Sequence, residues 1–555
     1  MNDEATKLEE QPSVHTEPLN KSSNKKFIYA FLVLFIIIAL GSLGYFMVKG
    51  YSKPDQAETT EFVSGFPLNQ VSMHLINDQD LGKYPLVQFT VAYANVNLNI
   101  FEGLTVYRGT NLEPGLAESW TNPDPLTWRF ILRKGVKFHS GDPFTAEDIK
   151  FTIEQAKTSE KASIPWVSQP MAARVESVKI IDDYTIELKT REPDATLLRW
   201  LVWMGIVSKK QVTLNGIEKA VGTGPYKLIT LAKREAILQA NDEYWDGVPK
   251  VKKLIYKVVP SPEKAKEALE KGQLDIITIN SGESKIINTQ GFQSANFRTG
   301  GINWMFLDVN SAKSKYVTGT EKNPFKDVRV RKAITLALDV NKLSSEAGLN
   351  AEPVTQFATQ ELIGFNPQLK RLKTDLDEAK SLLNEAGFPD GFSFTLISDQ
   401  QVEHIKAVEE IKKQLAEIGI TVVLSQPEID KFYEQLFSGD FSAAYVSYYP
   451  DTIDSLDLID IIFHGKIGSH GSLNVTNYSN SELDTVLDQA RSTFDEGKRI
   501  ELTRQAHALI MQDYPSIPLF TDIYHIYSRD NISYKPSITV MLLGFDMSGR
   551  QRVTK

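Results

Sequence analysis

The stretch LAESWTNPDPLTWRFILRKGVKFHSGDPFTAEDI, residues 116–149, decides the fold of this chain. At its centre, residues 127–132 alternate between apolar and polar side chains, which predicts a β-strand. The large apolar side chains on one face of that strand are Trp128, Phe130 and Leu132. Lys134-Gly135 predicts a turn, and a second short strand follows it. The first part of the stretch is therefore predicted to be two strands with one apolar face.

The end of the same stretch predicts the start of a helix. Pro143 ends the second strand, and Thr145 with Asp148 has the spacing of a capping box. Phe144 and Ile149 have the spacing of a hydrophobic staple, which fixes the angle at which the chain enters the helix. Nothing in the stretch is arranged for chemistry, so it specifies structure rather than a site.

Motifs in the rest of the chain follow the order found in one protein family. They are NIFEGL at 99–104, PGLA at 114–117, GTGPYKL at 222–228, NPFKDVRVRKAITLALD at 323–339, LDEAKSLLNEAGF at 376–388, NYSNSELDTVLDQA at 477–490 and DYPSIPLF at 513–520. With residues 116–149 they resemble the family 5 extracellular solute-binding proteins over residues 62–545. That family supplies peptides, and in some branches nickel, haem or sugars, to ABC importers.

The composition is that of a globular protein with more than one domain. The chain has 555 residues, 42% of them hydrophobic and 24% charged, which exceeds the size of a single hydrophobic core. The net charge of −9 argues against a nucleic-acid partner, because phosphate binding needs an excess of Lys and Arg. Cysteine is absent, which excludes disulfides, thiolate ligands and a lipid-modified cysteine anchor.

An apolar run at residues 27–48 predicts a membrane anchor. The run has no charged residue and is long enough to cross a hydrocarbon core of about 30 Å as a helix. Lys21, Lys25 and Lys26 precede it, so the positive-inside rule places the N-terminus in the cytoplasm and the large domain outside. A cleaved signal peptide is the alternative, and it would use Ala39 and Gly41 as a small-residue cleavage site.

Two polar segments flank the predicted anchor. Residues 1–26 contain a stretch rich in Glu, Asn, Pro and Ser, and we expect them to form a disordered cytoplasmic tail. Residues 49–61 are rich in Gly, Ser, Pro, Thr and Glu, and we expect them to form a short stalk.

The rest of the chain predicts an α/β fold, because helix and strand patterns alternate. Residues 402–418 keep helical spacing, Gly419 ends that helix, and residues 420–424 continue as a strand. Residues 175–189 predict a β-hairpin within an antiparallel subdomain. Ser481 and Asp484 have the spacing of another helix cap.

The family resemblance implies a two-lobed, type II periplasmic-binding-protein-like fold. Lobe I would comprise residues 62–300, with an extra subdomain at about 106–220, and would receive residues 516–555 back from lobe II. Lobe II would comprise residues 301–515. The crossing segments would lie near residues 301–310 and 513–520, and a ligand would bind between the lobes.

The patterns expected of an enzyme are missing from the sequence. There is no His-Glu-x-x-His, no Gly-x-Ser-x-Gly and no Walker loop, so we expect no catalysis and no cofactor. His464 and His470 lie close together in HGKIGSH, but as metal ligands they would need partners from elsewhere. We therefore interpret this segment as a solvated loop and predict no metal site.

The candidate ligand site is residues 445–457, YVSYYPDTIDSLD. Peptide-binding members of the family often carry here an aromatic residue, an Asp that receives the ligand's α-amino group, and an Asp-Pro pair. The resemblance assigns these roles to Tyr448, Asp451 and Asp454, although Tyr replaces the usual Trp and Ser455 replaces the usual Pro. A carboxylate and an ammonium group form a charge-assisted hydrogen bond in a desolvated cleft. The alternative interpretation is an acidic surface loop that starts a helix.

Two more candidates lie in INWMFLDVN, on the expected first crossing. The family often places an aromatic side chain and an Asn against the ligand here, and these positions hold Trp304 and Asn310. Packing in the core is an equally good interpretation for Trp304. For Phe101 and Glu102 of the NIFEGL motif we favour a structural role over ligand contact.

The sequence therefore predicts the membrane-anchored, substrate-capturing subunit of an ABC importer. Its expected ligand is a peptide, and its expected partners are a permease with its ATPase subunits, with no nucleic acid and no second copy of the chain. Binders of nickel chelates, haem or oligosaccharides are alternatives within the family. A surface sensor or adhesin that kept the fold is the alternative outside transport.

Overall fold

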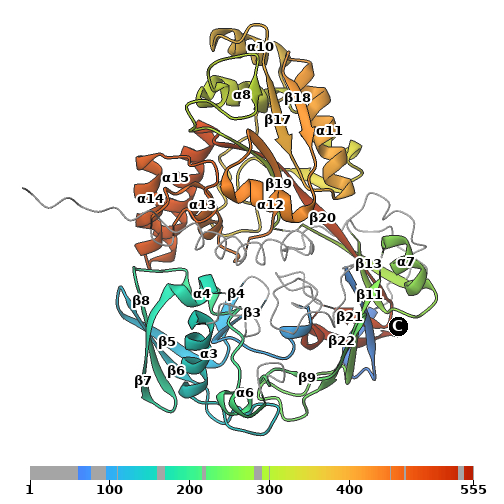
Figure 1. Cartoon of the computed structure of the whole chain (residues 1–555). Helices are drawn as coiled ribbons and strands as arrows, with labels where there is room; N and C mark the ends of the chain where they lie inside the picture. The colour runs from blue at the N-terminus through green and yellow to red at the C-terminus, as the bar shows by residue number, and fades with distance from the viewer. Residues whose placement is uncertain are drawn as a thin grey trace, which may run out of the picture.

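The computed structural model describes residues 61–76, 95–108, 111–158, 169–215, 221–259, 261–279, 291–298, 300–450, 452–467, 470–534 and 543–553. The fold is α/β with two lobes (Figure 1). Each lobe has its own hydrophobic core, one drawn mainly from residues before 300 and the other from residues 302–520. The predicted tail, anchor and stalk lie outside the described residues. Among the described residues, no helix has the length and apolar character needed to cross a bilayer.

The stretch that decides the fold has the predicted first strand and helix, but the predicted second strand is wrong. The chain turns back on itself there, with the backbone N–H of Phe138 donating to the carbonyl of Asp142, and only an isolated bridge joins Lys137 to Pro143. Strand β6 (Thr127–Leu132) buries alternate side chains and pairs with β5 (Ala117–Asp124). Helix α3 (Ala146–Thr158) follows, and the backbone N–H of Thr145 donates to Asp148 Oδ2 at 3.0 Å. Phe144 and Ile149 are both buried, as a hydrophobic staple requires. The local sequence therefore predicts the strand and the helix start, while distant residues complete them, since residues 185–189 pair with β6 and the backbone N–H of Lys209 donates to Asp148 Oδ1.

The predicted antiparallel subdomain is confirmed. Strands β7 (Val175–Asp182) and β8 (Thr185–Thr190) form the expected hairpin, and all pairs in the sheet β5-β6-β8-β7 are antiparallel. Helices α3 and α4 (Gln169–Arg174) pack together beside this sheet (Figure 1). The subdomain forms one end of lobe I.

The remaining described elements of lobe I surround a larger sheet. Its strands are β2 (Val71–Ile76), β9 (Tyr226–Ala232), β10 (Glu235–Ala240), β11 (Lys253–Val259), β12 (Ile276–Ile279) and β13 (Phe292–Arg298). The smaller elements are β1 (Glu61–Phe66), β3 (Thr105–Arg108), β4 (Asn111–Pro114), β21 (Ile532–Tyr534), β22 (Met547–Val553), α5 (Leu197–Trp200), α6 (Lys209–Asn215), α7 (Pro262–Glu270) and the 3₁₀-helix Gly544–Asp546.

Lobe II is a mixed sheet flanked by helices. Its strands are β14 (Ile302–Leu307), β15 (Val317–Thr318), β16 (Ala351–Pro353), β17 (Ser393–Ile397), β18 (Thr421–Ser425) and β19 (Ala443–Tyr448). Its helices are the 3₁₀-helix Pro324–Lys326, α8 (Val328–Ala337), α9 (Val340–Glu346), α10 (Leu376–Glu385), α11 (Val402–Ala416), α12 (Ile429–Ser438), α13 (Ser455–Phe463), α14 (Ser481–Ser492) and α15 (Glu496–Asp513). The predicted unit of helix, Gly419 and strand is present as α11 and β18.

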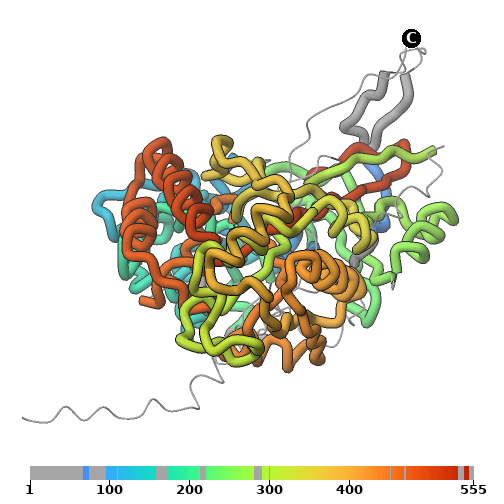
Figure 2. Tube along the Cα trace, turned by 90° about the horizontal axis from the view of Figure 1, so that it is seen from above, coloured from blue at the N-terminus to red at the C-terminus, as the bar shows by residue number. Residues whose placement is uncertain are grey.

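One long strand, β20 (Ser516–Arg529), belongs to both lobes. Its first half pairs with β14 and β16 of lobe II, and its second half pairs with β12 and β13 of lobe I. Figure 2 shows β20 and β13 running side by side away from lobe II. The sheets of the two lobes are therefore joined by continuous backbone hydrogen bonding.

Motifs that are far apart in the sequence meet in lobe I. The backbone N–H groups of Gly224 and Tyr226 donate to the carbonyls of Ile100 and Asn99, both at 2.9 Å. A Cβ atom on Gly222 would lie 1.9 Å from the carbonyl oxygen of Ile100. Glycine is therefore required where the GTGPYKL motif crosses the NIFEGL motif.

One predicted helix cap is wrong by a residue. The N-cap of α14 is Asn480, whose side chain accepts from the backbone N–H groups of Glu482 and Leu483. Ser481, the predicted cap, is the first residue of the helix. Both residue types favour caps, so the sequence alone did not separate two adjacent candidates.

We expect Gly222→Ala to destabilise lobe I by about 1–3 kcal/mol, because the added methyl group meets backbone that cannot move independently. Gly497→Ala is the matched control, since a Cβ atom there has its nearest neighbour at 3.5 Å in the first turn of α15. That control should keep or raise stability by up to about 1 kcal/mol. Urea unfolding of both variants measures the difference, and equal midpoints would show that the crossing is not tightly packed.

Candidate ligand-binding site

The segment with the predicted ligand residues joins β19 to α13. Strand β19 ends at Tyr448, and Asp454 is the N-cap of α13, with its Oδ1 accepting from the backbone N–H of Leu456 at 3.1 Å. Asp451 lies between them in sequence and is outside the described residues. Its neighbour Ile453 belongs to the core of lobe I, although β19 and α13 belong to lobe II. The segment therefore reaches the junction of the two lobes.

Aromatic side chains form a buried floor beneath this segment. The ring of Trp304 lies 6.1 Å from that of Tyr448 and 5.8 Å from that of Phe357, measured between centroids. Trp304 and Tyr448 are both buried, at 1% and 0% exposure. Trp304 also contacts Phe306, which confirms that these two residues share one face of the crossing strand. Both predicted aromatic residues thus pack inside the protein in this structure.

Asn310 is separated from the other predicted site residues. Strand β14 pairs antiparallel with β19, so Ile302 lies opposite Tyr448 while Asn310 follows the far end of β14. The strand between them spans about 17 Å. Asn310 is exposed, and its side-chain N–H donates to the carbonyl of Asn477 at 2.7 Å.

The carboxylate of Asp454 is engaged by basic residues of the protein. It is fully buried, Arg499 Nη1 donates to its Oδ2, and Arg199 Nε lies 3.6 Å from the same oxygen. Arg499 is on α15 of lobe II, whereas Arg199 is on α5 of lobe I. Asp454 therefore starts a helix and joins the lobes electrostatically.

Asp454 is part of a larger set of paired charges, which we call the junction network. Its carboxylates are Asp194, Asp454, Asp457, Asp460 and Glu496, and its guanidinium groups are Arg174, Arg199, Arg491 and Arg499. Residues of the network lie on the lobe I subdomain and on α13, α14 and α15, which face each other in Figure 1. Of these side chains only Glu496 is largely exposed.

Several contacts of the junction network cross between the lobes. Arg174 of lobe I lies 3.5 Å from Asp457, and Arg491 of lobe II lies 3.5 Å from Asp194. Thr196 Oγ1 donates to Asp457 Oδ1 at 2.8 Å, and the backbone N–H of residue 195 donates to the carbonyl of Arg491. These contacts require the lobes to be together on this side of the molecule.

The network sets the ionisation of its acids. Burial opposes ionisation of Asp194, but Arg174 and Arg491 outweigh it and lower the pKa of Asp194 to about 2. Burial raises the pKa of Asp457, and the negative charges of Asp454 and Asp194 raise it further. Arg174 and Arg491 oppose this increase without cancelling it. Removing one arginine would leave buried carboxylates without a partner, which typically costs 3–5 kcal/mol.

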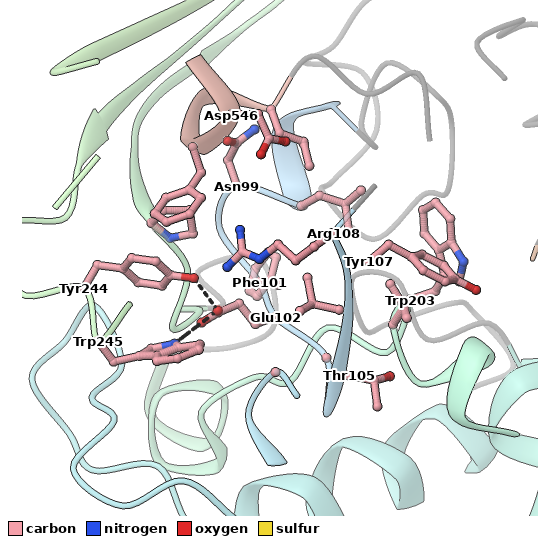
Figure 3. Close-up of a pocket in the computed structure, with 18 residues that line it drawn as sticks. Asn99, Phe101, Glu102, Thr105, Tyr107, Arg108, Trp203, Tyr244, Trp245 and Asp546 are labelled. Carbon is pink, nitrogen blue, oxygen red and sulfur yellow. Dashed lines mark hydrogen bonds between the residues drawn. The ribbon is translucent and has the colours of Figure 1, made fainter. Parts of the chain in front are cut away.

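A pocket in lobe I adjoins this junction (Figure 3). Its volume is about 90 Å³, and its walls include Phe101, Glu102, Tyr107 and Trp203. Tyr107 is buried, close to the backbone of Ile453 and to the charge of Arg199, and burial raises its pKa. The pocket is large enough for a few water molecules or one side chain, but not for a whole peptide.

Glu102 in this pocket has the structural role that we favoured. It accepts hydrogen bonds from Tyr244 Oη at 2.7 Å and from Trp245 Nε1 at 3.1 Å (Figure 3). It also accepts one from Thr223 Oγ1 at 2.7 Å. Burial raises the pKa of Glu102 to about 7, although these donors favour the charged form. Glu102 thereby connects three segments of lobe I.

Sequence reasoning missed the basic half of the junction network. Arg491 follows the apolar stripe of α14, one helical turn after Leu487, and such a position in a buried stripe is a detectable signal. Arg174 and Arg199 carry no such signal, because their partners in lobe II, Asp457 and Asp454, are more than 250 residues away in sequence. Only the folded chain brings these groups together.

The structure is a two-lobed α/β fold whose lobes share strand β20 and meet again at the charged junction network. The family described as "Bacterial extracellular solute-binding proteins, family 5 Middle" matches residues 111–470. The chain belongs to this family. The family resemblance inferred from the sequence motifs is thus confirmed.

Named relatives and solved structures agree with this assignment. The chain is 27% identical to "Heme-binding protein A" of Haemophilus influenzae, over 74% of this chain and 79% of the relative. It is 27% identical to "Periplasmic oligopeptide-binding protein OppA" of Salmonella typhimurium, over 79% and 84% respectively. The structure of the periplasmic binding protein DppA from Helicobacter pylori, in complex with the peptide STSA, has the same fold, with a TM-score of 0.71 and 24% identity over 87% of this chain and 98% of that one.

We expect His507→Gln to flatten the pH dependence of stability. His507 of α15 is fully buried, its Nε2 lies 3.0 Å from Ser455 Oγ, and burial lowers its pKa from 6.5 to about 3. As the pH falls below 6.5 the unfolded chain takes up a proton there and the folded chain does not. Stability is therefore full above pH 6.5 and falls towards pH 3, by about 2 kcal/mol between pH 7.5 and 5.

Urea unfolding at pH 7.5 and 5.0 measures this effect. His139→Gln is a parallel control, because burial lowers the pKa of His139 to about 4 and the same sign applies. In each variant, the loss of unfolding free energy between pH 7.5 and 5.0 should shrink by the amount that its histidine contributes. An unchanged difference between the two pH values in His507→Gln would mean that the folded chain protonates this residue.

Proposed function

We propose that this chain captures peptides outside the cell and delivers them to an ABC importer. The observation that carries the proposal is the position of the β19–α13 segment, whose ends lie at the junction of the lobes over an aromatic floor. The relatives named as dipeptide-binding and oligopeptide-binding proteins support a peptide ligand. No bond is made or broken in this function.

In this proposal, Asp451 receives the α-ammonium group of the peptide. An ammonium group that leaves water needs a carboxylate partner, and the resemblance to peptide-binding family members assigns that role to Asp451. Asp454 is already paired with Arg499 and Arg199, so it holds the segment in place rather than binding the ammonium group. Tyr448 and Trp304 support the segment from below, and Asn310 contributes at the far end of the crossing strand.

Closure follows from differential affinity. A peptide that touches both lobes stabilises the closed state more than the open one, and a shift from 1:99 to 99:1 needs about 5.5 kcal/mol of difference. Backbone and termini would provide most of the contacts, with side chains in hydrated pockets such as that of Figure 3. Loose specificity for side chains is the expected result.

The finer features predicted from the sequence belong to the same proposal. We propose lobe boundaries at 62–300, 301–515 and 516–555, with a subdomain at about 106–220. Residues 27–48 anchor the chain in the membrane, after a cytoplasmic tail and before a stalk at 49–61. The chain acts as a monomer at the extracellular face and docks on a permease with its ATPase subunits.

We expect Asp451→Ala to weaken peptide binding at least about 30-fold. The substitution leaves the ligand's ammonium group unpaired in a desolvated cleft, which costs about 2–5 kcal/mol. Trialanine and N-acetyl-trialanine are titrated by calorimetry into the full chain and into the variant. The acetylated peptide should bind the parent poorly and lose little more in the variant, because its ammonium group is already gone.

Asp242→Ala is the matched control, since that carboxylate is 75% exposed on the surface of lobe I. It should bind trialanine like the parent. If Asp451→Ala binds trialanine within about twofold of the parent, the peptide-terminus role is lost. Haem and nickel chelates then become the leading ligands, and the relative named "Heme-binding protein A" makes haem the first to titrate.

We expect the full-length protein to stay with membranes after carbonate extraction. The apolar run at 27–48 has no charged residue and lies behind three lysines, as an uncleaved anchor requires. Mass spectrometry of the purified protein should recover peptides from residues 1–26. A mature N-terminus near residue 42 would instead show that the run is a cleaved signal peptide.

A further inference from the structure

His464 and His470 form a buried pair at the C-terminal end of α13. They are 3% and 8% exposed, and their rings are stacked with centroids 4.3 Å apart. The prediction of a solvated loop is wrong for these two residues, because α14 and the lobe I subdomain cover them through Asp488 and Glu192. Burial of two adjacent imidazoles requires polar partners for their nitrogen atoms.

The Nδ1 atom of each ring is committed as a hydrogen-bond donor. His464 Nδ1 lies 2.7 Å from the carbonyl oxygen of Gly465, and His470 Nδ1 lies 2.7 Å from Asp460 Oδ1. Carbonyl and carboxylate oxygens only accept, so both Nδ1 atoms carry hydrogen. In the neutral rings, each Nε2 atom therefore has a free lone pair.

Both Nε2 atoms point at carboxylates, which also offer only lone pairs. His464 Nε2 lies 3.1 Å from Asp488 Oδ1. His470 Nε2 lies 3.4 Å from Glu192 Oε2 and 3.8 Å from Asp488 Oδ1. Lone pairs facing lone pairs at these distances require positive charge between them.

That charge can come from protons or from one metal ion. Two protonated rings stacked at 4.3 Å would repel each other in a buried site. One divalent ion between the rings and the carboxylates supplies the charge without that repulsion. The other charges near the pair favour it too, because Asp460 and Asp484 add negative charge and Arg491 is the permanent cation that pairs with Asp460.

We propose that His464, His470, Asp488 and Glu192 form a binding site for a divalent transition metal ion, with zinc as the best match. His464 Nε2 lies 3.1 Å from Asp488, and His470 Nε2 lies 3.4 Å from Glu192 and 3.8 Å from Asp488. These separations are close to the edge of about 3.3 Å between neighbouring ligands of a tetrahedral zinc ion. Two imidazoles with two carboxylates suit zinc and its neighbours and exclude the oxygen-only sets of calcium and magnesium.

The surroundings of the four donors are those of a metal site. Asp460 and the Gly465 carbonyl hold the Nδ1–H groups of the two ligand histidines, which fixes the tautomer and the ring orientation. Asp460, His464 and His470 also offer ligand atoms within 4.8 Å of one another, which makes Asp460 an alternative carboxylate ligand at the same place. Histidine ligands with carboxylate partners behind them are the usual arrangement at zinc.

The site joins the two lobes. Glu192 follows β8 in the lobe I subdomain, whereas the other three donors belong to lobe II. It is distinct from the proposed peptide site, because Asp454 and His464 cap opposite ends of α13, about 15 Å apart. A bound metal ion would thus hold the lobes together at the outer side of the junction, whatever the solute.

Zinc titration of the full chain tests the site. The protein is purified without a polyhistidine tag, stripped with a chelator and titrated with ZnCl₂ by calorimetry. We expect one zinc ion per chain and a rise in melting temperature by mass action. Losing a group that hydrogen-bonds to a metal ligand usually weakens metal binding about 10–100-fold. Losing a ligand itself should cost no less, so His464→Gln, His470→Gln and Asp488→Asn should each weaken zinc binding at least about tenfold.

Glu192→Gln tests the contribution of lobe I and should also weaken zinc binding about tenfold. His525→Gln is the matched control, because His525 is a partly buried histidine of β20 that contacts Asn350. It should bind zinc like the parent. Because the side chain of Asp488 is 59% exposed, Asp488→Asn should keep the fold. It therefore tests the site even if a histidine variant fails to fold.

The proposal is overturned if the stripped parent takes up no zinc. It is also overturned if His464→Gln, His470→Gln and Asp488→Asn all bind zinc as tightly as the parent, since the metal then sits elsewhere. Normal binding by Glu192→Gln alone would overturn the link between the lobes. Cobalt substitution adds a second readout, because a tetrahedral site gives intense visible absorption that the three variants should lose.

Discussion

The backbone pairing of β20 is the constraint on which the rest of the structure depends. This strand of 14 residues completes the sheet of lobe II with its first half and the sheet of lobe I with its second half. Relative motion of the lobes must therefore bend a strand whose hydrogen bonds are fixed on both sides. Bending about this strand moves the junction network, whereas the start of the β19–α13 segment is tied to β20 by the hydrogen bond from Tyr449 Oη to Asp522 Oδ2.

In the proposed function, the junction network affects how easily the lobes separate. Burying a charge costs several kcal/mol, and an ion pair recovers much of this only when its geometry is good. The network contains five carboxylates and four guanidinium groups, so separating the lobes would lose pairing energy but return buried charges to water, and the two effects oppose each other. A ligand that adds a few kcal/mol can then decide the state of the molecule, as binding and release require.

Sequence predicted what depends on neighbouring residues. Strand β6, the capping box at Thr145 and the hairpin of β7 and β8 follow from residues within a few positions of each other, and the structure confirms them. It did not predict what depends on long-range contact. The partners of Asp454 and the burial of His464 come from segments that only the folded chain brings together, and no local pattern shows which carboxylate meets which cation. Family motifs supplied the two-lobed arrangement that periodicity alone left open.

Two ligands that both bridge the lobes cannot bind independently. The proposed metal ion holds Glu192 of lobe I against lobe II, and the proposed peptide does the same at the β19–α13 segment. Each therefore favours the closed state, and by thermodynamic linkage each must raise the affinity for the other by the same factor. The factor is largest when the unliganded lobes are mostly open and vanishes when they are already closed, because an equilibrium that lies fully to one side cannot be shifted further. The strength of the junction network thus sets how strongly the two sites communicate.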